Sequence, residues 1–237
     1  MAAFCSAEPD CPLGADPKRA TEVFQKLAQP LIDKPIPAGK GRELTWVKAV
    51  GGVTSGLYSK VMWPTIIAGI AGLRDGRGDT LLALRDIIHE RTADGTYSNS
   101  VEATLAINCL DEERHSPDEE TAMKRAFVEA APYTDTGRPV TDVRDGCEQW
   151  PVQPTLGYPY ATDIEGLPDT LTVSTTGDGV TPHEGGISLA KTLGGSLLTV
   201  EGSQHGAVLA RNSCINDAVA NYLIRLKTPG DKARCQL

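Results

Sequence analysis

The sequence lacks several features that would assign a biochemical class at once. It has no run of about 18 uninterrupted apolar residues, and so offers no membrane span. It has no basic surplus: the net charge is −8, which argues against the phosphate-neutralising surface of a nucleic-acid-binding protein. Aromatic residues are only 5% of the chain, but 40% hydrophobic and 23% charged residues over 237 positions are typical of a globular protein with a sizeable core.

Cofactor and metal motifs are missing as well. The paired glycines at 51–52 and 194–195 lack the lysine of a phosphate loop and the spacing of a dinucleotide fingerprint. The six cysteines include no C-x-x-C pair and have no ligand-like histidine nearby, so they do not meet zinc spacing. The sequence therefore predicts no metal and no organic cofactor.

The six cysteines favour disulfides instead, which would place the chain in an oxidising compartment. Proximity along the chain favours Cys5–Cys11 and Cys214–Cys235, leaving Cys109–Cys147, but spacing alone leaves the connectivity open. The alternative is six buried free thiols in a cytosolic protein. The first residues have neither a basic start nor an apolar stretch, so they predict no signal peptide.

Apolar residues at helical spacing dominate the first 131 residues, and residues 132–168 are rich in Pro, Gly and Tyr. Ser116 is the expected N-cap of the last of these helices, which has acidic residues in its first turn. The predicted helices lie within 18–31, 44–58, 63–73, 80–90, 100–109 and 117–131.

From residue 169 the pattern changes to strands alternating with helices. Strands are predicted at 171–173 and 197–200, and helices at about 183–193 and 214–226. Two strands joined by one helix form a β-α-β unit with parallel strands. Because a parallel sheet needs more strands and cover on both faces, we expect this unit to be part of a larger sheet.

Each predicted strand runs into a polar turn that presents one side chain of catalytic type. Asp178 stands in Ser174-Thr-Thr-Gly-Asp-Gly-Val-Thr-Pro182, and His205 stands in Glu201-Gly-Ser-Gln-His-Gly206. An acid and then a histidine, each just past a strand, is the second half of the α/β-hydrolase order Ser, Asp, His. The G-x-S-x-G turn that should precede them does not occur. The alternative is a turn aspartate and a surface-loop histidine.

At these two motifs the chain resembles the actinobacterial tripeptidyl aminopeptidases, secreted serine peptidases of the α/β-hydrolase fold related to proline iminopeptidase. The likeness extends to four further segments: Cys11-Pro-Leu-Gly14, Ala106-Ile-Asn-Cys-Leu-Asp111, Cys147-Glu-Gln-Trp-Pro151 and the stretch from Cys214 to Cys235. The resemblance implies an α/β fold. Residues 1–165 would form a mainly helical cap and its return to the core, and residues 166–237 the last two parallel strands and helices of the core. The N-terminal nucleophile half would be absent.

The resemblance also implies roles for particular residues. Asp178 would be the triad acid and His205 the base, with Thr181 supporting the aspartate turn. Carboxylates near the cap, here Asp111 and Glu112, would hold the amino group of the substrate, although a solvated acidic turn is the favoured alternative. The implied disulfides are Cys5–Cys11, Cys109–Cys147 and Cys214–Cys235.

The predicted function is that of the C-terminal portion of a secreted or cell-envelope serine hydrolase that releases short peptides from polypeptide N-termini. Its partners would be a peptide or protein N-terminus as substrate and the missing nucleophile half. The chain alone is predicted to be inactive, because an acid and a base without a serine cannot form an acyl-enzyme. Two alternatives remain: an esterase or lipase on the same frame, and a non-catalytic peptide-binding remnant.

Other residues of chemical interest receive plainer interpretations. The remaining histidines, His89, His115 and His183, are predicted to be solvated. Four large aromatic residues could line a cleft, although packing is the more common fate of such side chains. They are Trp63, Trp150, Tyr158 and Tyr160.

Overall fold

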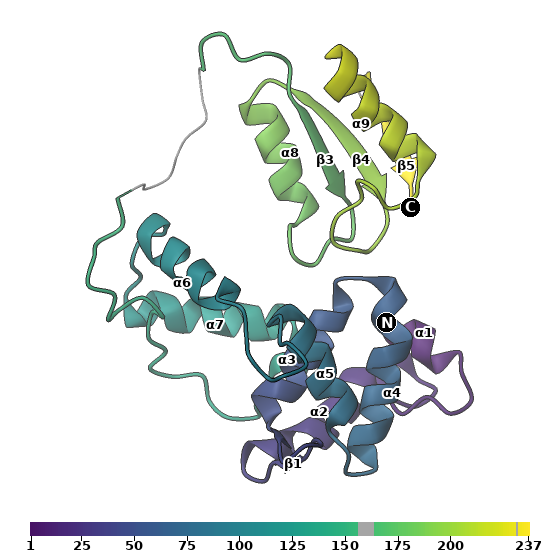
Figure 1. Ribbon diagram of the computed structural model, residues 1–237, viewed down its shortest axis with the longest axis vertical. Coiled ribbons are helices and arrows are strands. Elements are labelled where there is room, and N and C mark those ends of the chain that lie inside the picture. The colour runs from purple at the N-terminus through teal and green to yellow at the C-terminus, as the bar shows by residue number, and fades with distance from the viewer. Residues whose placement is uncertain (156–163, 231) are drawn as a thin grey trace. The chain divides into compact units, whose positions relative to one another are not determined.

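The computed structural model describes residues 1–155, 164–230 and 232–237 and divides the chain into two compact units (Figure 1). The N-terminal unit comprises Met1–Leu57 and Val61–Pro159, and the C-terminal unit comprises Tyr58–Lys60 and Tyr160–Leu237. Each unit has its own cluster of buried hydrophobic residues. The predicted roles of cap for residues 1–165 and core segment for residues 166–237 stay predictions.

The N-terminal unit is mainly helical, as the apolar spacing predicts. Its α-helices are α1 (Ala2–Ser6), α2 (Ala20–Ala28), α3 (Trp46–Leu57), α4 (Trp63–Arg74), α5 (Asp79–Ile88), α6 (Ser100–Asp111) and α7 (Pro117–Ala130). Short 3-10 helices cover Pro17–Arg19, Gln29–Ile32, Lys60–Met62 and Pro132–Thr134. Two strands that the sequence did not predict, β1 (Ile36–Pro37) and β2 (Glu43–Leu44), form an antiparallel pair.

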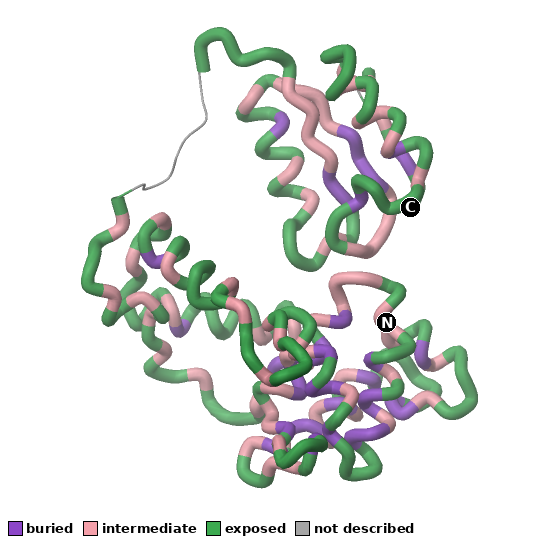
Figure 2. Tube along the Cα trace, in the orientation of Figure 1, coloured by how far each residue is buried: buried purple, intermediate pink, exposed green. Residues whose placement is uncertain are grey.

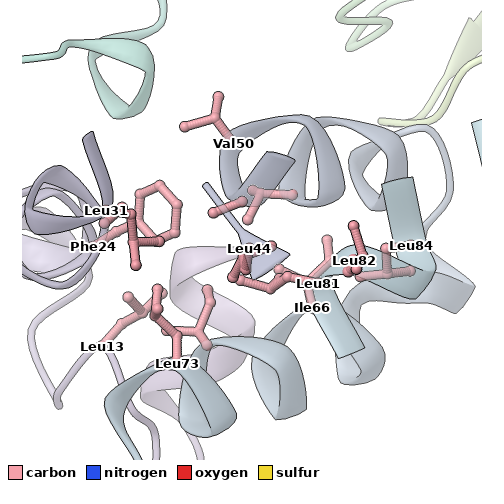
Figure 3. Packing of buried hydrophobic residues seen from close by; sticks show 14 of the residues in the cluster. Leu13, Phe24, Leu31, Leu44, Val50, Ile66, Leu73, Leu81, Leu82 and Leu84 are labelled. Carbon is pink, nitrogen blue, oxygen red and sulfur yellow. The ribbon is translucent and has the colours of Figure 1, made fainter. Parts of the chain in front are cut away.

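The core of this unit lies between α3, α4 and α5. Leu44, Ile66 and Leu81 are fully buried there, and Figure 3 shows their side chains gathered with other leucines of the cluster. Gly52 of α3 faces α5 so closely that a Cβ atom would lie 2.1 Å from the Leu81 carbonyl oxygen. Only a glycine therefore allows α3 and α5 to approach this closely.

Helices α6 and α7 contribute little to that core. Cys109 is the buried residue of α6 and Thr121 that of α7, so Figure 2 shows both helices mostly exposed. Ser116 caps α7 as predicted: its hydroxyl accepts from the Glu119 N–H, and the Glu119 carboxylate accepts from the Ser116 N–H. The Cys109–Cys147 disulfide and a hydrogen bond from the Val143 N–H to Thr121 Oγ1 tie the following segment to the two helices.

In the residues that the structure describes, the C-terminal unit is a three-stranded parallel sheet with one helix on each face (Figure 1). Its elements are β3 (Leu171–Thr175), α8 (His183–Thr192), β4 (Ser196–Glu201), α9 (Ser213–Arg225) and β5 (Arg234–Gln236), in strand order β3-β4-β5. Ile215 of α9 packs with Leu198 and Val200 on one face, and α8 packs on the other. The prediction of two strands misses β5, a three-residue strand held to α9 by the Cys214–Cys235 disulfide.

The disulfides are Cys5–Cys11, Cys109–Cys147 and Cys214–Cys235, the same pairing that the resemblance implies. Three disulfides are typical of a protein that works outside the cytoplasm. None of the described helices is long and apolar enough to cross a membrane.

The close approach at Gly52 predicts that alanine substitution at Gly52 and at the adjacent Gly51 of α3 will have opposite or very different effects on the free energy of unfolding. Gly52→Ala should lower the free energy of unfolding by about 1–3 kcal/mol, because its methyl group would collide with the backbone of α5. Gly51→Ala is the matched control, since a Cβ there lies no closer than 3.7 Å to the Arg85 side chain. Alanine should be neutral there or stabilise the helix by up to about 1 kcal/mol. Chemical denaturation measures both, and equal effects would contradict this packing.

The Cys109–Cys147 disulfide should be what keeps α6 and α7 ordered. It joins residues 38 apart, so replacing both cysteines with alanine should cost about 4 kcal/mol and remove amide-exchange protection from α6 and α7. Cys5–Cys11 joins residues only 6 apart, and its removal should cost about 2 kcal/mol and spare these helices. Unchanged protection of α6 and α7 in the first variant would show that packing alone holds them.

Candidate active site

Parallel pairing of β3 with β4 brings the two predicted catalytic loops together. Leu171 pairs with Ser196 and Thr175 with Val200, so both strands end at the same edge of the sheet. The pairing continues into the loops, where the Gly177 N–H donates to the Gly202 carbonyl oxygen at 2.8 Å. The loop after β3 carries Asp178, and the loop after β4 carries His205.

Asp178 and His205 form a hydrogen-bonded pair. The His205 Nδ1 atom lies 3.1 Å from Asp178 Oδ1 and 3.0 Å from Oδ2. The aspartate side chain is 4% exposed, whereas the histidine side chain is 37% exposed. A buried carboxylate thus holds one nitrogen of a ring that is open to solvent, and Nε2 is the nitrogen left for a reacting group.

The carboxylate of Asp178 is held by its own loop. Its Oδ1 accepts from the N–H groups of Val180 and Thr181 at 2.9 and 3.0 Å, and Oδ2 accepts from the Thr181 hydroxyl at 2.9 Å. Burial works to raise the pKa of Asp178, but these hydrogen bonds and the one from His205 outweigh it and lower the pKa to about 2. Asp178 is therefore an anion at any pH near neutrality. Thr181 contacts it where the sequence predicts a supporting residue.

A hollow of about 610 Å³ opens beside the pair within the C-terminal unit. Asp178 and His205 line it together with residues of β3 and the first turns of α8, among them Thr172, Ser174 and Gly186. In the same unit, the Tyr58 ring meets the His205 ring edge-on with centroids 5.4 Å apart. The histidine is thus exposed at the margin of a hollow, where its ring is open to small molecules.

His183 departs from the prediction that it is solvated. It is the first residue of α8, is half-buried, and places Nδ1 3.0 Å from the hydroxyl of Ser174 on β3. Ser174 is itself only 8% exposed. Ser174 stands in the motif around Asp178 and His183 directly follows that motif, but their contact depends on how α8 packs on the sheet.

The other predicted residues lie in the N-terminal unit or beyond the described chain. Asp111 is the last residue of α6 and Glu112 is its C-cap, so their assignment to the substrate's amino group stays a proposal. Tyr158 and Tyr160 lie outside the described residues.

His115 is exposed, as predicted, and joins an acidic cluster with Glu120 and Asp145. The ring Nδ1 of His115 lies 3.3 Å from Glu120 Oε1, and the backbone N–H of His115 donates to Asp145 Oδ2 at 3.0 Å. The Cys147 N–H donates to the other oxygen of Asp145 and is the main cause that lowers the pKa of this carboxyl. Both oxygens of Asp145 are thus already bonded, and Arg114 and Arg144 line a small hollow together with His115 and Asp145.

Comparison with known proteins relates this chain to one family. Residues 131–235 match the family described as TAP-like protein. Serine protease Hip1 of Mycobacterium tuberculosis is 41% identical over 243 residues, which cover 99% of this chain and 46% of that protein. Carboxylesterase B of the same species is 35% identical over 238 residues, or 99% of this chain and 45% of that protein.

A shorter match concerns the tripeptidyl aminopeptidase of Streptomyces lividans. It is 35% identical over 91 residues, which cover 38% of this chain and 17% of that protein. Hip1 and carboxylesterase B match 99% of this chain, and the chain spans about half of the length of each. With its parallel sheet and its family match, the chain belongs to the TAP-like family of α/β-hydrolases.

Proposed function

We propose that this chain is the cap-bearing C-terminal portion of a serine hydrolase that releases short peptides from polypeptide N-termini. Asp178 and His205 would be the acid and base of its triad. The serine would come from a segment outside these 237 residues. The observation that carries the proposal is the hydrogen bond between the buried Asp178 carboxylate and Nδ1 of the exposed His205 ring.

The chemistry follows from the free nitrogen of that ring. His205 Nε2 takes the proton from the serine hydroxyl as its oxygen attacks the scissile carbonyl carbon, and then donates it to the leaving amine. Water repeats the sequence on the acyl-serine: it loses a proton to His205, and the serine regains one as the acid product leaves. Asp178 keeps the proton of the neutral ring on Nδ1 and stabilises the imidazolium form.

Three observations support an external serine. The sequence contains no G-x-S-x-G turn, the feature that exposes the nucleophile in this fold. In Hip1 and carboxylesterase B, the part that matches this chain is about half of the protein, so each has about as many further residues outside the match. Among the described residues, β3 is paired only with β4, so its outer edge is available to a further parallel strand.

The preference for a peptide N-terminus rests on carboxylates and on one relative. Asp111 and Glu112 end a helix with two adjacent negative charges, which suit an ammonium group. A relative named tripeptidyl aminopeptidase shares 91 aligned residues with this chain. Three disulfides favour a site of action outside the cell or in its envelope.

An esterase is the second candidate, and the 35% identity to a carboxylesterase favours it. The same acid and base serve acyl transfer from esters and from amides. A panel of aminoacyl-amide, tripeptidyl-amide and short-chain ester substrates on the active enzyme separates the two. A peptidase needs the free amino terminus, so N-acetylation of the substrate should abolish its cleavage and leave ester hydrolysis unaffected. Peptide binding without turnover of any substrate would favour the non-catalytic remnant.

The proposal predicts inactivity of the chain by itself and activity of the assembled enzyme. The 237-residue chain should neither hydrolyse the panel nor react with a fluorophosphonate probe. The intact mass of the native protein from its host shows whether further sequence is attached to this chain. In that native protein, His205→Ala should lower kcat by about 10⁶-fold. Asp178→Asn should lower it by about 10⁴-fold.

His89→Ala is the matched control, because this histidine lies at the end of α5 in the N-terminal unit. It should leave kcat unchanged. Turnover by the chain alone that disappears on replacement of one of its own serines would refute an external nucleophile. Activity that persists in His205→Ala would refute the assignment of the base.

The low pKa of Asp178 predicts a loss of stability in acid. Because the pKa in the folded chain is about 2, below its value near 3.9 in unfolded protein, ionised Asp178 stabilises the fold above pH 4. That contribution, about 2 kcal/mol, disappears as the pH falls from about 4 to about 2. Urea denaturation at several pH values should show a shallower acid decline in Asp178→Asn than in the parent chain. Parallel pH profiles would mean that the carboxylate is not held as described.

A further inference from the structure

We propose that His183 and Ser174 form a positioning pair that closes the base of the Asp178 loop and thereby orients the acid toward His205. The catalytic meaning of this pair rests on the proposed function, but its structural effect on Asp178 and His205 does not. The proposal concerns only residues of the C-terminal unit.

The two residues stand at the two ends of the loop. Ser174 is the penultimate residue of β3, and His183 is the first residue of α8. Nine positions separate them in sequence, yet the His183 Nδ1 atom lies 3.0 Å from the Ser174 hydroxyl oxygen. Asp178 lies between them, so this contact joins the ends of the segment that carries the acid.

The first turn of α8 also packs closely against β3 at Gly186. A Cβ atom on Gly186 would lie 2.4 Å from Ser174 Oγ, so the first turn of α8 rests directly on this serine. Ser174 is 8% exposed and has little room to move. The hydrogen bond to His183 therefore gives a buried hydroxyl its partner and gives the helix a fixed starting direction.

The start of α8 in turn sets the geometry of the acid. Thr181, two residues before His183, donates to Asp178 from both its N–H and its hydroxyl. A shift of the helix start would move Thr181 and therefore the Asp178 carboxylate, whose Oδ2 lies 3.0 Å from His205 Nδ1. Because catalysis is sensitive to displacements of about 1 Å, a contact outside the triad can control its rate.

The test compares His183→Phe and Ser174→Ala in the ¹⁵N-labelled 237-residue chain. The first keeps a ring and removes both ring nitrogens, including Nδ1; the second removes only the hydroxyl. The readout is the pair of ring-nitrogen chemical shifts of His205, which report its tautomer and its hydrogen bond to Asp178. We expect both variants to shift the His205 signals by the same amount, and the double variant to add nothing to either.

Two further variants separate positioning from general stability. His183→Asn places an amide near the position of Nδ1 and should restore the His205 signals. Ser188→Ala removes an exposed hydroxyl from the same helix and should change nothing. Unchanged His205 signals in His183→Phe, even with a lower melting temperature, would overturn the proposal. So would an effect of Ser174→Ala that His183→Phe does not share.

Kinetics on the active native protein give the second readout. Each of the two single variants should lower kcat by about 10- to 100-fold with little change in KM, because the pair acts on the acid and not on the substrate. Shifted His205 signals without any hydrolase activity in the parent protein would contradict the proposed function and leave the positioning pair intact. Normal kcat in an enzyme whose His205 signals have shifted would overturn the link to catalysis.

Discussion

The parallel register between β3 and β4 is the constraint on which the candidate site depends. Because Thr175 pairs with Val200, the two strands end level, and the turns that follow them face one another. Asp178 and His205, which are 27 residues apart in the chain, thereby come within 3.0 Å. A register shifted by one residue would turn the strand side chains to the opposite faces and separate the two loops. The buried Leu198 and Val200 of β4 fix that register against α9.

The parts that could be predicted from the sequence are those that local pattern determines. Helices α2 to α7 follow from apolar spacing, and the cap of α7 follows from Ser116 and the acidic residues in the first turn after it. The site residues Asp178 and His205 could be named because each follows a strand. Strand β5 could not, since three residues carry no periodicity and its place is fixed by the Cys214–Cys235 disulfide. The contact of His183 with Ser174 depends on tertiary packing for the same reason.

The C-terminal unit carries features typical of a sheet that continues. Among the described residues its sheet has three strands, with β3 at one edge, and parallel sheets of this size are rarely left open. Leu223, Ile224 and Leu226 at the end of α9 are each at least 69% exposed, which is unusual for three neighbouring aliphatic side chains. An open edge at β3 and exposed aliphatic residues on α9 are both expected of a unit whose remaining strands and helices come from another part of a larger protein.

The proposed acid and base are held in place by residues of the C-terminal unit. Every contact that orients Asp178 comes from its own loop, from Thr181 and Val180, or from His205. Since the acid of a triad acts by orienting the histidine, the contacts that the proposed roles require of Asp178 all lie within the C-terminal unit. A serine brought close to Nε2 would then need no rearrangement of Asp178. In the proposed enzyme, the choice between amide and ester substrates would not come from this pair, which suits both, but from the residues that hold the rest of the substrate.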